Sequence, residues 1–212
     1  MRRFLSRLAA VALLVSPLAC TAQPETYVEG EHYKEVRNVE TSEPGAIAVT
    51  EVFWYGCRHC YNFEPHINEW KRTKAEDVTF ERLPTALGRS AGRLHVRAFY
   101  TAQELEVTDE VHGRIFNAIH QQGRSLASED TLAGIFSQAG IEVDTFRKTF
   151  NSFTVENRTR RSEQRIADFG IASVPTVVVD GRWQVSAGQA GSFEEMISII
   201  NFLVDKARSN KG

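Results

Sequence analysis

The sequence is poor in cysteine, in long apolar runs and in excess charge of either sign, and each shortage excludes a class of protein. It contains three cysteines in 212 residues, and its formal net charge is −2. Structural zinc sites usually have four ligands, and the one cysteine besides Cys57 and Cys60, which is Cys20, lies far from them in the sequence. No apolar run reaches the roughly 20 residues that a membrane-spanning helix needs. The charge balance also provides no basic excess for binding nucleic acid.

The first 22 residues differ in composition from the rest of the chain. Residues 1–7 include three arginines, the apolar run 8–15 comes next, and small residues follow it. This order is typical of a secretory signal peptide. We favour cleavage after Ala22; the alternative is a lipid anchor on Cys20, although Pro17 stands where lipoprotein signals usually have leucine. Without residues 1–22, the chain has 22 basic and 27 acidic residues, a net charge near −5.

The stretch from 47 to 70 organises the chain. Residues 47–56 are mostly apolar and rich in β-branched and aromatic side chains, which predicts a buried strand. Gly56 allows a tight turn, and Cys57 follows it at the first turn of the next helix. The unpaired N–H groups and positive dipole end at that position favour a thiolate over a thiol. Cys57 and Cys60 can therefore form a small redox-active disulfide whose first sulfur remains open to attack.

Other uses of this cysteine pair explain the sequence less well. A purely structural disulfide needs neither a charged, histidine-containing spacer nor a strand-to-helix junction. His59 and His66 are candidate metal ligands on paper, but no second CxxC or HxxxH pattern accompanies them. We therefore expect redox chemistry carried by the cysteines themselves, with no metal and no cofactor. In an exported protein such a pair makes or exchanges disulfides, because disulfides persist outside the cytosol.

The remaining pattern predicts an α/β protein interrupted by helices. From 85 to 162, helix follows helix without a strand signal, and Asp144 is expected to cap one of these helices. The Asp180-Gly181 pair between apolar runs predicts a β-hairpin. The other expected elements are an edge strand at 33–39, a helix at 61–73 that contains Pro65, a strand at 77–83, a long helix at 155–169, and a terminal helix opened by the capping box Ser192-x-x-Glu195.

This order resembles a thioredoxin fold interrupted by a helical domain. More specifically, the chain is similar to the DsbA family of bacterial periplasmic thiol:disulfide oxidoreductases. The runs 53–61 (FWYGCRHCY) and 170–175 (GIASVP) carry the resemblance. It implies an α/β fold with a thioredoxin-like domain made of 23–84 and 163–212. An all-helical insertion, 85–162, interrupts that domain, and the signal peptide, 1–22, is removed.

The resemblance also implies roles for single residues. Cys57 corresponds to the nucleophile and Cys60 to the cysteine that resolves the mixed disulfide. Pro175 corresponds to a cis-proline facing the disulfide, and the backbone of Val174 to a partner for a substrate strand. A strand-initiating proline with a trans bond is the alternative, since only about 5–6% of X–Pro bonds are cis.

Charged residues around the cysteines are further candidates. His59 can supply positive charge that favours the Cys57 thiolate. Arg58 replaces the family's usual proline; it adds charge beside the substrate site and leaves the reduction potential open. Glu51 matches a buried acid that relays protons to the resolving cysteine, and Glu64 is a second such candidate. If the strand had an exposed edge at that point, Glu51 would instead be solvated.

The activity implied is the introduction of disulfide bonds into exported proteins in the periplasm. Its substrates would be unfolded proteins with free cysteines, and a quinone-linked membrane protein of the DsbB type would reoxidise it. Isomerases and thioredoxin-like reductases on the same scaffold are the alternatives. Isomerases usually dimerise through an extra N-terminal domain, for which residues 23–46 are too few, so we expect a monomer. No nucleic-acid partner is expected.

Overall fold

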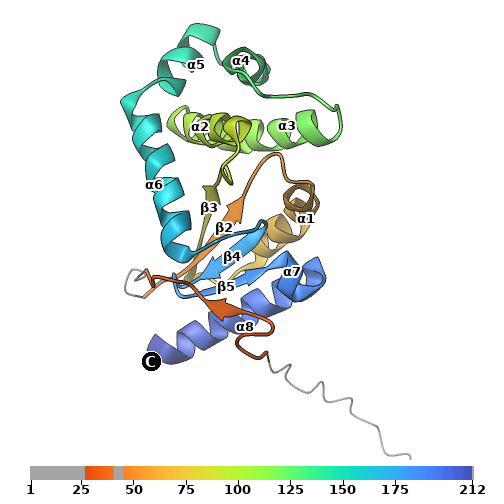
Figure 1. The fold of residues 1–212 in the computed structure, drawn as a ribbon, viewed down its shortest axis with the longest axis vertical. Coiled ribbons are helices and arrows are strands. Elements are labelled where there is room, and N and C mark those ends of the chain that lie inside the picture. Colours follow the sequence, from red (N-terminus) through yellow and green to blue (C-terminus); the bar gives the residue numbers. More distant parts are fainter. Residues whose placement is uncertain (1–26, 41–44, 212) are drawn as a thin grey trace, which may run out of the picture.

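The computed structural model describes residues 27–40 and 45–211, so the expected signal peptide and Cys20 lie outside the described residues. Strands and helices follow one another along the chain as in Figure 1. Their bounds are β1 (Lys34–Glu35), β2 (Ile47–Phe53), α1 (Arg58–Thr73), β3 (Val78–Pro84), α2 (Ser90–Glu104), α3 (Thr108–His120), α4 (Glu129–Ser137), α5 (Val143–Phe150), α6 (Phe153–Phe169), β4 (Thr176–Val179), β5 (Trp183–Ser186), α7 (Ala187–Ala190) and α8 (Phe193–Lys211).

The five strands form one mixed sheet in the order β1-β5-β4-β2-β3. Strands β2 and β3 are parallel and are joined through α1, because a parallel pair needs a crossover connection. The other neighbouring strands are antiparallel. Most of β2 is buried, which explains its nearly continuous apolar sequence. The edge strand expected at 33–39 is only two residues long, and the strand expected at 77–83 is β3, shifted by one residue.

The hairpin predicted at Asp180-Gly181 joins β4 to β5. Both turn residues have positive φ, 54° and 61°, as the favoured two-residue hairpin turns require. A Cβ at position 181 would lie 2.1 Å from the carbonyl oxygen of Glu40, so the close approach of the two backbones also requires glycine.

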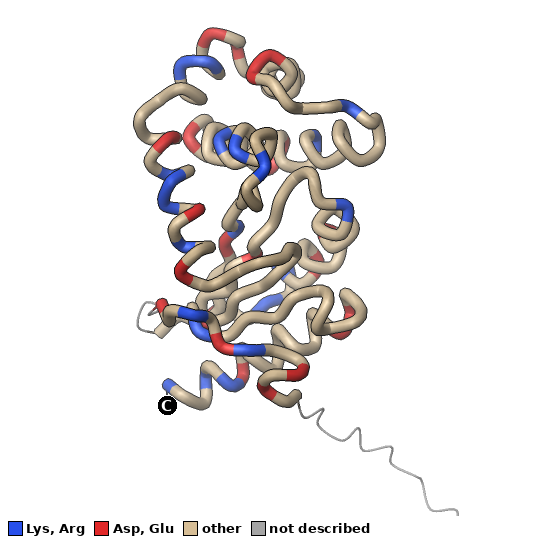
Figure 2. Tube along the Cα trace, viewed as in Figure 1, with Lys and Arg blue, Asp and Glu red and all other residues tan. Residues whose placement is uncertain are grey.

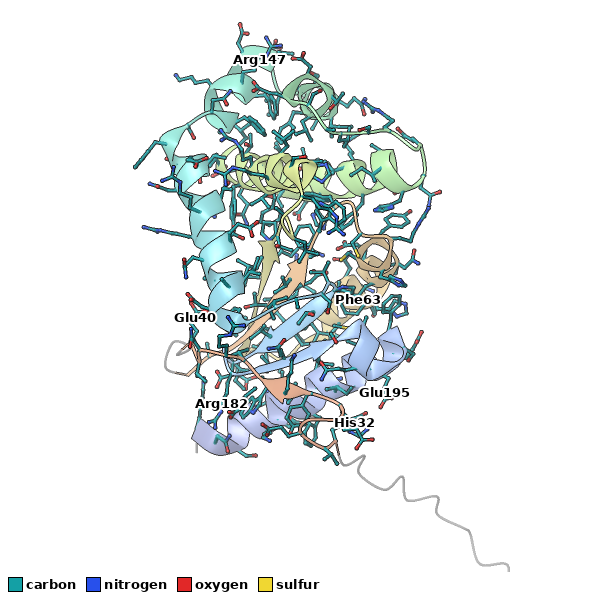
Figure 3. All side chains as sticks on the ribbon, in the orientation of Figure 1. His32, Glu40, Phe63, Arg147, Arg182 and Glu195 are labelled. Carbon is teal, nitrogen blue, oxygen red and sulfur yellow. The ribbon has the colours of Figure 1, made fainter. Side chains whose placement is uncertain are left out.

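Helices cover both faces of the sheet, and more helices stand beyond its upper end (Figure 1). On one face, α1 and α8 bury apolar side chains against Val49, Val177 and Val179. On the other face, α6 packs Ile166 and Phe169 against the alternate strand residues. A third cluster joins the upper end of β2 to α2–α6, and side chains fill this space in Figure 3. The residues around the cysteines therefore belong to the core shared by the sheet and the helices.

Residues 90–169 contain five consecutive helices, α2 to α6. The expected insertion boundaries remain a prediction; the C-terminal one, at 162/163, falls inside the continuous helix α6. The expectation that Asp144 caps a helix is wrong. Helix α5 begins at Val143 and Glu142 occupies the cap position, so Asp144 lies within the first turn, where its charge favours the helix dipole. Basic and acidic residues are interspersed along α6 (Figure 2). Within 27–40 and 45–211, no helix is long and apolar enough to span a membrane.

Candidate functional site: a CxxC pair on a helix start

Cys57 occupies the N-cap position of α1, where β2 passes through a short turn into the helix. The expected helix at 61–73 in fact begins at Arg58 and continues through Pro65 to Thr73. The Cys57 sulfur accepts a hydrogen bond from the Cys60 backbone N–H, with N and S 3.3 Å apart. It therefore satisfies one of the otherwise unpaired N–H groups of the first turn. Arg58 and His59, the two spacer residues, are exposed.

The two cysteines are unpaired in this structure and differ sharply in environment. Cys57 is partly exposed, whereas Cys60 is completely buried. Hydrogen bonding from the Cys60 thiol, above all, lowers the pKa of Cys57 to about 6; backbone N–H groups and the charge of His59 add to this, and partial burial opposes it. Burial instead raises the pKa of Cys60 far above its ordinary value, and the charge of Glu51 adds to that rise. The accessible sulfur is thus the one that favours the thiolate.

The loop before β4 lies against the Cys57 sulfur. The Val174–Pro175 peptide bond is cis, as expected. The carbonyl oxygen of Val174 lies 3.5 Å from the Cys57 sulfur, within reach of a thiol hydrogen bond. A groove bordered by His59, Pro175 and Phe193 lies at this loop. Pro175 has no N–H, so a chain that pairs with this loop must use the backbone groups of its neighbours.

Glu51 is completely buried in the middle of β2, which contradicts a solvated position. Its Oε2 accepts a hydrogen bond of 2.9 Å from Nε of Arg82, the residue opposite it on β3. Its Oε1 is buried and has no hydrogen-bond partner among the described residues. Burial raises the pKa of Glu51 to about 7, although the charge of Arg82 opposes the rise. Glu51 can therefore exchange a proton near neutral pH.

Glu64 extends the buried polar group from Glu51 toward the helices. Arg82 also donates a hydrogen bond to the Glu64 carboxylate, at 3.2 Å, and Nε2–H of His112 donates another to the same carboxylate, at 3.1 Å. The other ring nitrogen of His112 lies 2.9 Å from the Tyr55 hydroxyl. Burial would raise the pKa of Glu64, but His112 and Arg82 lower it overall. A continuous set of polar contacts thus connects the strand beneath the cysteines to α3.

The structure brings most of the residues expected from the sequence into one place. Cys57, Cys60 and Val174 meet at the start of α1, and Glu51 lies in the core beneath them. Arg82 and His112 did not emerge from the sequence. Arg82 appeared as an ordinary polar position of an alternating strand, and His112 lies on the same side of α3 as the apolar Val111, Ile115 and Phe116.

Comparisons with known proteins agree with a redox-active cysteine pair. Residues 66–195, beginning after Cys60, match the family model described as DSBA-like thioredoxin domain. Among relatives named thiol:disulfide interchange protein DsbA, the one from Pseudomonas aeruginosa is 34% identical over 203 residues, which are 95% of this chain and 96% of the relative. The one from Azotobacter vinelandii is 36% identical over 181 residues, 85% and 84% of the two chains.

Solved structures show the same architecture. The crystal structure of Pseudomonas aeruginosa DsbA matches with a TM-score of 0.81 at 34% identity, over 87% of this chain and 96% of that chain. The crystal structure of oxidoreductase DsbA from Xylella fastidiosa matches with a TM-score of 0.80 at 31% identity, over 86% and 98%. The fold class expected from the sequence, a thioredoxin fold interrupted by helices, is confirmed.

Proposed function

Because the chain belongs to the DsbA family of thiol:disulfide oxidoreductases, we propose that it oxidises pairs of thiols in exported proteins through Cys57 and Cys60. The observation that carries the proposal is the contrast between the two sulfurs. Cys57 is accessible and its pKa is lowered to about 6, whereas Cys60 is buried and its pKa is raised. A disulfide between them is therefore open to attack at Cys57 and gains a stabilised thiolate when it is reduced.

The reaction consists of two exchange steps. A substrate thiolate attacks the Cys57 sulfur of the disulfide, a substrate–Cys57 bond forms, and the Cys57–Cys60 bond breaks with its electron pair on Cys60. A second substrate thiolate then attacks the substrate sulfur of the mixed disulfide. This step forms the substrate disulfide and releases the Cys57 thiolate. The substrate loses two electrons and the enzyme gains them.

Glu51 supplies the proton that Cys60 needs. A buried Cys60 thiolate is unfavourable, and Glu51 carries a proton part of the time near pH 7 because burial raises its pKa to about 7. We assign to protonated Glu51 the transfer of a proton to Cys60 after the first step, and to its carboxylate the reverse transfer during reoxidation. Arg82 holds one carboxylate oxygen and leaves the other unpartnered for this exchange.

Substrate and reoxidant share the surface around Cys57. In the proposal, an unfolded segment pairs with the backbone at Val174 and Pro175, and apolar side chains enter the groove beside Phe193. Arg58 and His59 face that segment from the helix start. A membrane protein of the DsbB type, linked to quinone, takes the two electrons and restores the disulfide. The cycle runs in the periplasm in this proposal, and the signal-peptide composition of residues 1–22 supports export.

Single-cysteine variants test these roles. We expect Cys57→Ser to abolish oxidation of dithiol peptides and to form no adduct with a peptide carrying an activated disulfide. Cys60→Ser should keep the attack by Cys57 and accumulate a mixed disulfide, which mass spectrometry detects. Adducts on Cys60 in the Cys57→Ser variant, with none on Cys57 in the other, would reverse the assignment.

A further inference from the structure

A layered arrangement of three residues lies next to the nucleophile, on the side of Cys57 that faces the loop between β3 and α2. The Trp54 indole lies flat on the backbone of Gly56: a Cβ there would be 2.2 Å from the ring. On the ring lies the Arg89 guanidinium, whose central carbon is 4.6 Å from the ring centroid. This distance is typical of a cation–π contact.

Trp54 is held in this position by its own hydrogen bond. Its indole N–H donates to Nδ1 of His95 at 3.1 Å, so His95 accepts there and carries its hydrogen on Nε2, which lies 3.1 Å from the carbonyl oxygen of Leu126. Burial lowers the pKa of His95 to about 4, so the ring is neutral at pH 7. The platform beneath Arg89 is therefore fixed by buried contacts.

Apart from its contact with the Trp54 ring, the charge of Arg89 has no partner in the part of the chain that the structure describes. The next two arginines of α2, Arg93 and Arg97, both form ion pairs with Glu156, whereas Arg89 is exposed and has no carboxylate partner. Arg89 is also the N-cap residue of α2 and makes no side-chain capping bond. A positive charge at the N-terminal end of a helix is unfavourable, so helix stability does not explain it.

Arg89 instead lines a groove that opens on the nucleophile. The groove has a cavity volume of about 720 Å³ and is bordered by Cys57, Val174 and Trp54. Glu163 is the other charged residue in its lining, and its carboxylate accepts a hydrogen bond of 2.7 Å from the Ala86 backbone N–H. A polypeptide whose cysteine reaches Cys57 along Val174 would place a neighbouring side chain in this groove.

We propose that Arg89, supported by Trp54, binds a carboxylate of the substrate, from an aspartate or glutamate next in sequence to the cysteine that attacks Cys57. The proposal rests on the proposed oxidation of substrate thiols and adds a preference among substrates. Acidic segments meet a guanidinium that is already oriented, and lysine-containing segments meet a like charge. Because Arg89 is exposed, the preference is modest and is screened by salt.

The test uses amidated dithiol peptides that differ only in one residue next to the first cysteine: glutamate, glutamine or lysine. Second-order rate constants for reduction of the oxidised protein are measured by alkylation and mass spectrometry at low and high ionic strength. We expect the glutamate peptide to react about 1.4- to 5-fold faster than the glutamine peptide at low salt, the range that an exposed ion pair gives. The lysine peptide should be slowest, and the differences should shrink at high salt.

Two variants locate the effect. Arg89→Gln should bring the glutamate-to-glutamine ratio close to one. Arg93→Gln, which removes the same charge one turn further along α2 and outside the groove, should leave the ratio unchanged. A ratio that is the same in wild type and Arg89→Gln, or that falls equally in Arg93→Gln, would overturn the proposal.

A failure of the proposed function itself would look different, because no peptide would be oxidised at all. Binding of the same three peptides to the Cys57→Ser variant, measured by titration with nuclear magnetic resonance, then decides the inference separately. Tighter binding of the glutamate peptide that Arg89→Gln abolishes supports the carboxylate site. Equal binding of the glutamate and glutamine peptides refutes it.

Discussion

Raising the pH from 5 to 8 should stabilise the reduced protein relative to the oxidised one. The cause is the Cys57 thiolate, because the pKa of Cys57 is lowered from an ordinary 9.0 to about 6 in the folded state. A lowered pKa contributes stability that is fully present above the unfolded value and is lost as the pH falls through the folded value. Cys60 contributes almost nothing in this range. Its raised pKa keeps it a thiol in the folded protein, and the ordinary value of 9.0 keeps it mostly a thiol in the unfolded protein.

The thiolate competes with the entropic effect of the disulfide. With these pKa values, it stabilises the folded reduced protein by about 0.1 kcal/mol at pH 5, ~1.4 kcal/mol at pH 7 and ~2.7 kcal/mol at pH 8. Closing a loop of about four residues stabilises the oxidised form by roughly 1.9 kcal/mol in the chain-entropy model. The two terms balance near pH ~7.4. Because Cys57 is partly exposed, solvent screening makes the thiolate values upper limits and moves the balance to higher pH.

Urea unfolding of both redox forms at pH 5, 7 and 8 measures this difference directly. We expect the oxidised form to be the more stable one at pH 5 and its advantage to shrink by up to about 2.6 kcal/mol by pH 8. Reduced Cys57→Ser is the control and should lack this change relative to the oxidised wild type. A difference between the redox forms that is constant across the range, or that grows with pH, would refute a thiolate-stabilised reduced state.

Three other substitutions have distinct expected outcomes. Glu51→Gln should slow the release of oxidised peptide in quenched reactions. Its free energy of unfolding, measured with urea, should also rise relative to that of wild type between about pH 4.5 and 7. The reason is that the pKa of Glu51 is raised to about 7 in the folded protein, so wild type loses stability as the pH rises through this range. A difference that stays constant with pH would argue against a buried, titrating Glu51. His112→Phe should lower the free energy of unfolding by about 2 kcal/mol or more in thermal or urea unfolding, because it leaves its buried partners Tyr55 and Glu64 without a hydrogen bond. The double variant with Tyr55→Phe should lose less than the sum of the losses in the two single variants. Gly56→Ala should lower the free energy of unfolding by roughly 1–3 kcal/mol and change the fluorescence of Trp54, since the added Cβ would overlap the indole ring. An unchanged fluorescence spectrum would contradict the layered arrangement.

The parts of the fold that could be predicted are those with a signal in a short stretch of sequence. The strand-to-helix junction at Cys57 depends on one apolar run and one glycine, and the hairpin at Asp180-Gly181 depends on two adjacent residues that accept positive φ. Both patterns act within a few residues, so no tertiary information is needed to recognise them. Asp144 shows the limit of such signals: its helix begins two residues earlier than capping by Asp144 would place it.

The partners of the buried acids could not be predicted, because they depend on register and on packing between distant segments. Glu51 and Arg82 face each other only because β2 and β3 pair with that alignment. His112 reaches Glu64 only because α3 packs over α1, and a histidine beside an apolar stripe carries no signal of this contact. The Trp54–Arg89 contact likewise joins two loops that no sequence pattern relates.

The reduction potential of the Cys57–Cys60 pair decides whether the protein is a thiol oxidant whose reduced form is stabilised by the Cys57 thiolate. The protein is equilibrated at pH 7 in buffers of defined reduced and oxidised glutathione, and the two forms are quantified after alkylation. With the pKa of Cys57 lowered to about 6, we expect a potential clearly less negative than the roughly −270 mV of thioredoxin. A potential at or below that of thioredoxin would refute the role of oxidant and identify the protein as a reductase on the same scaffold.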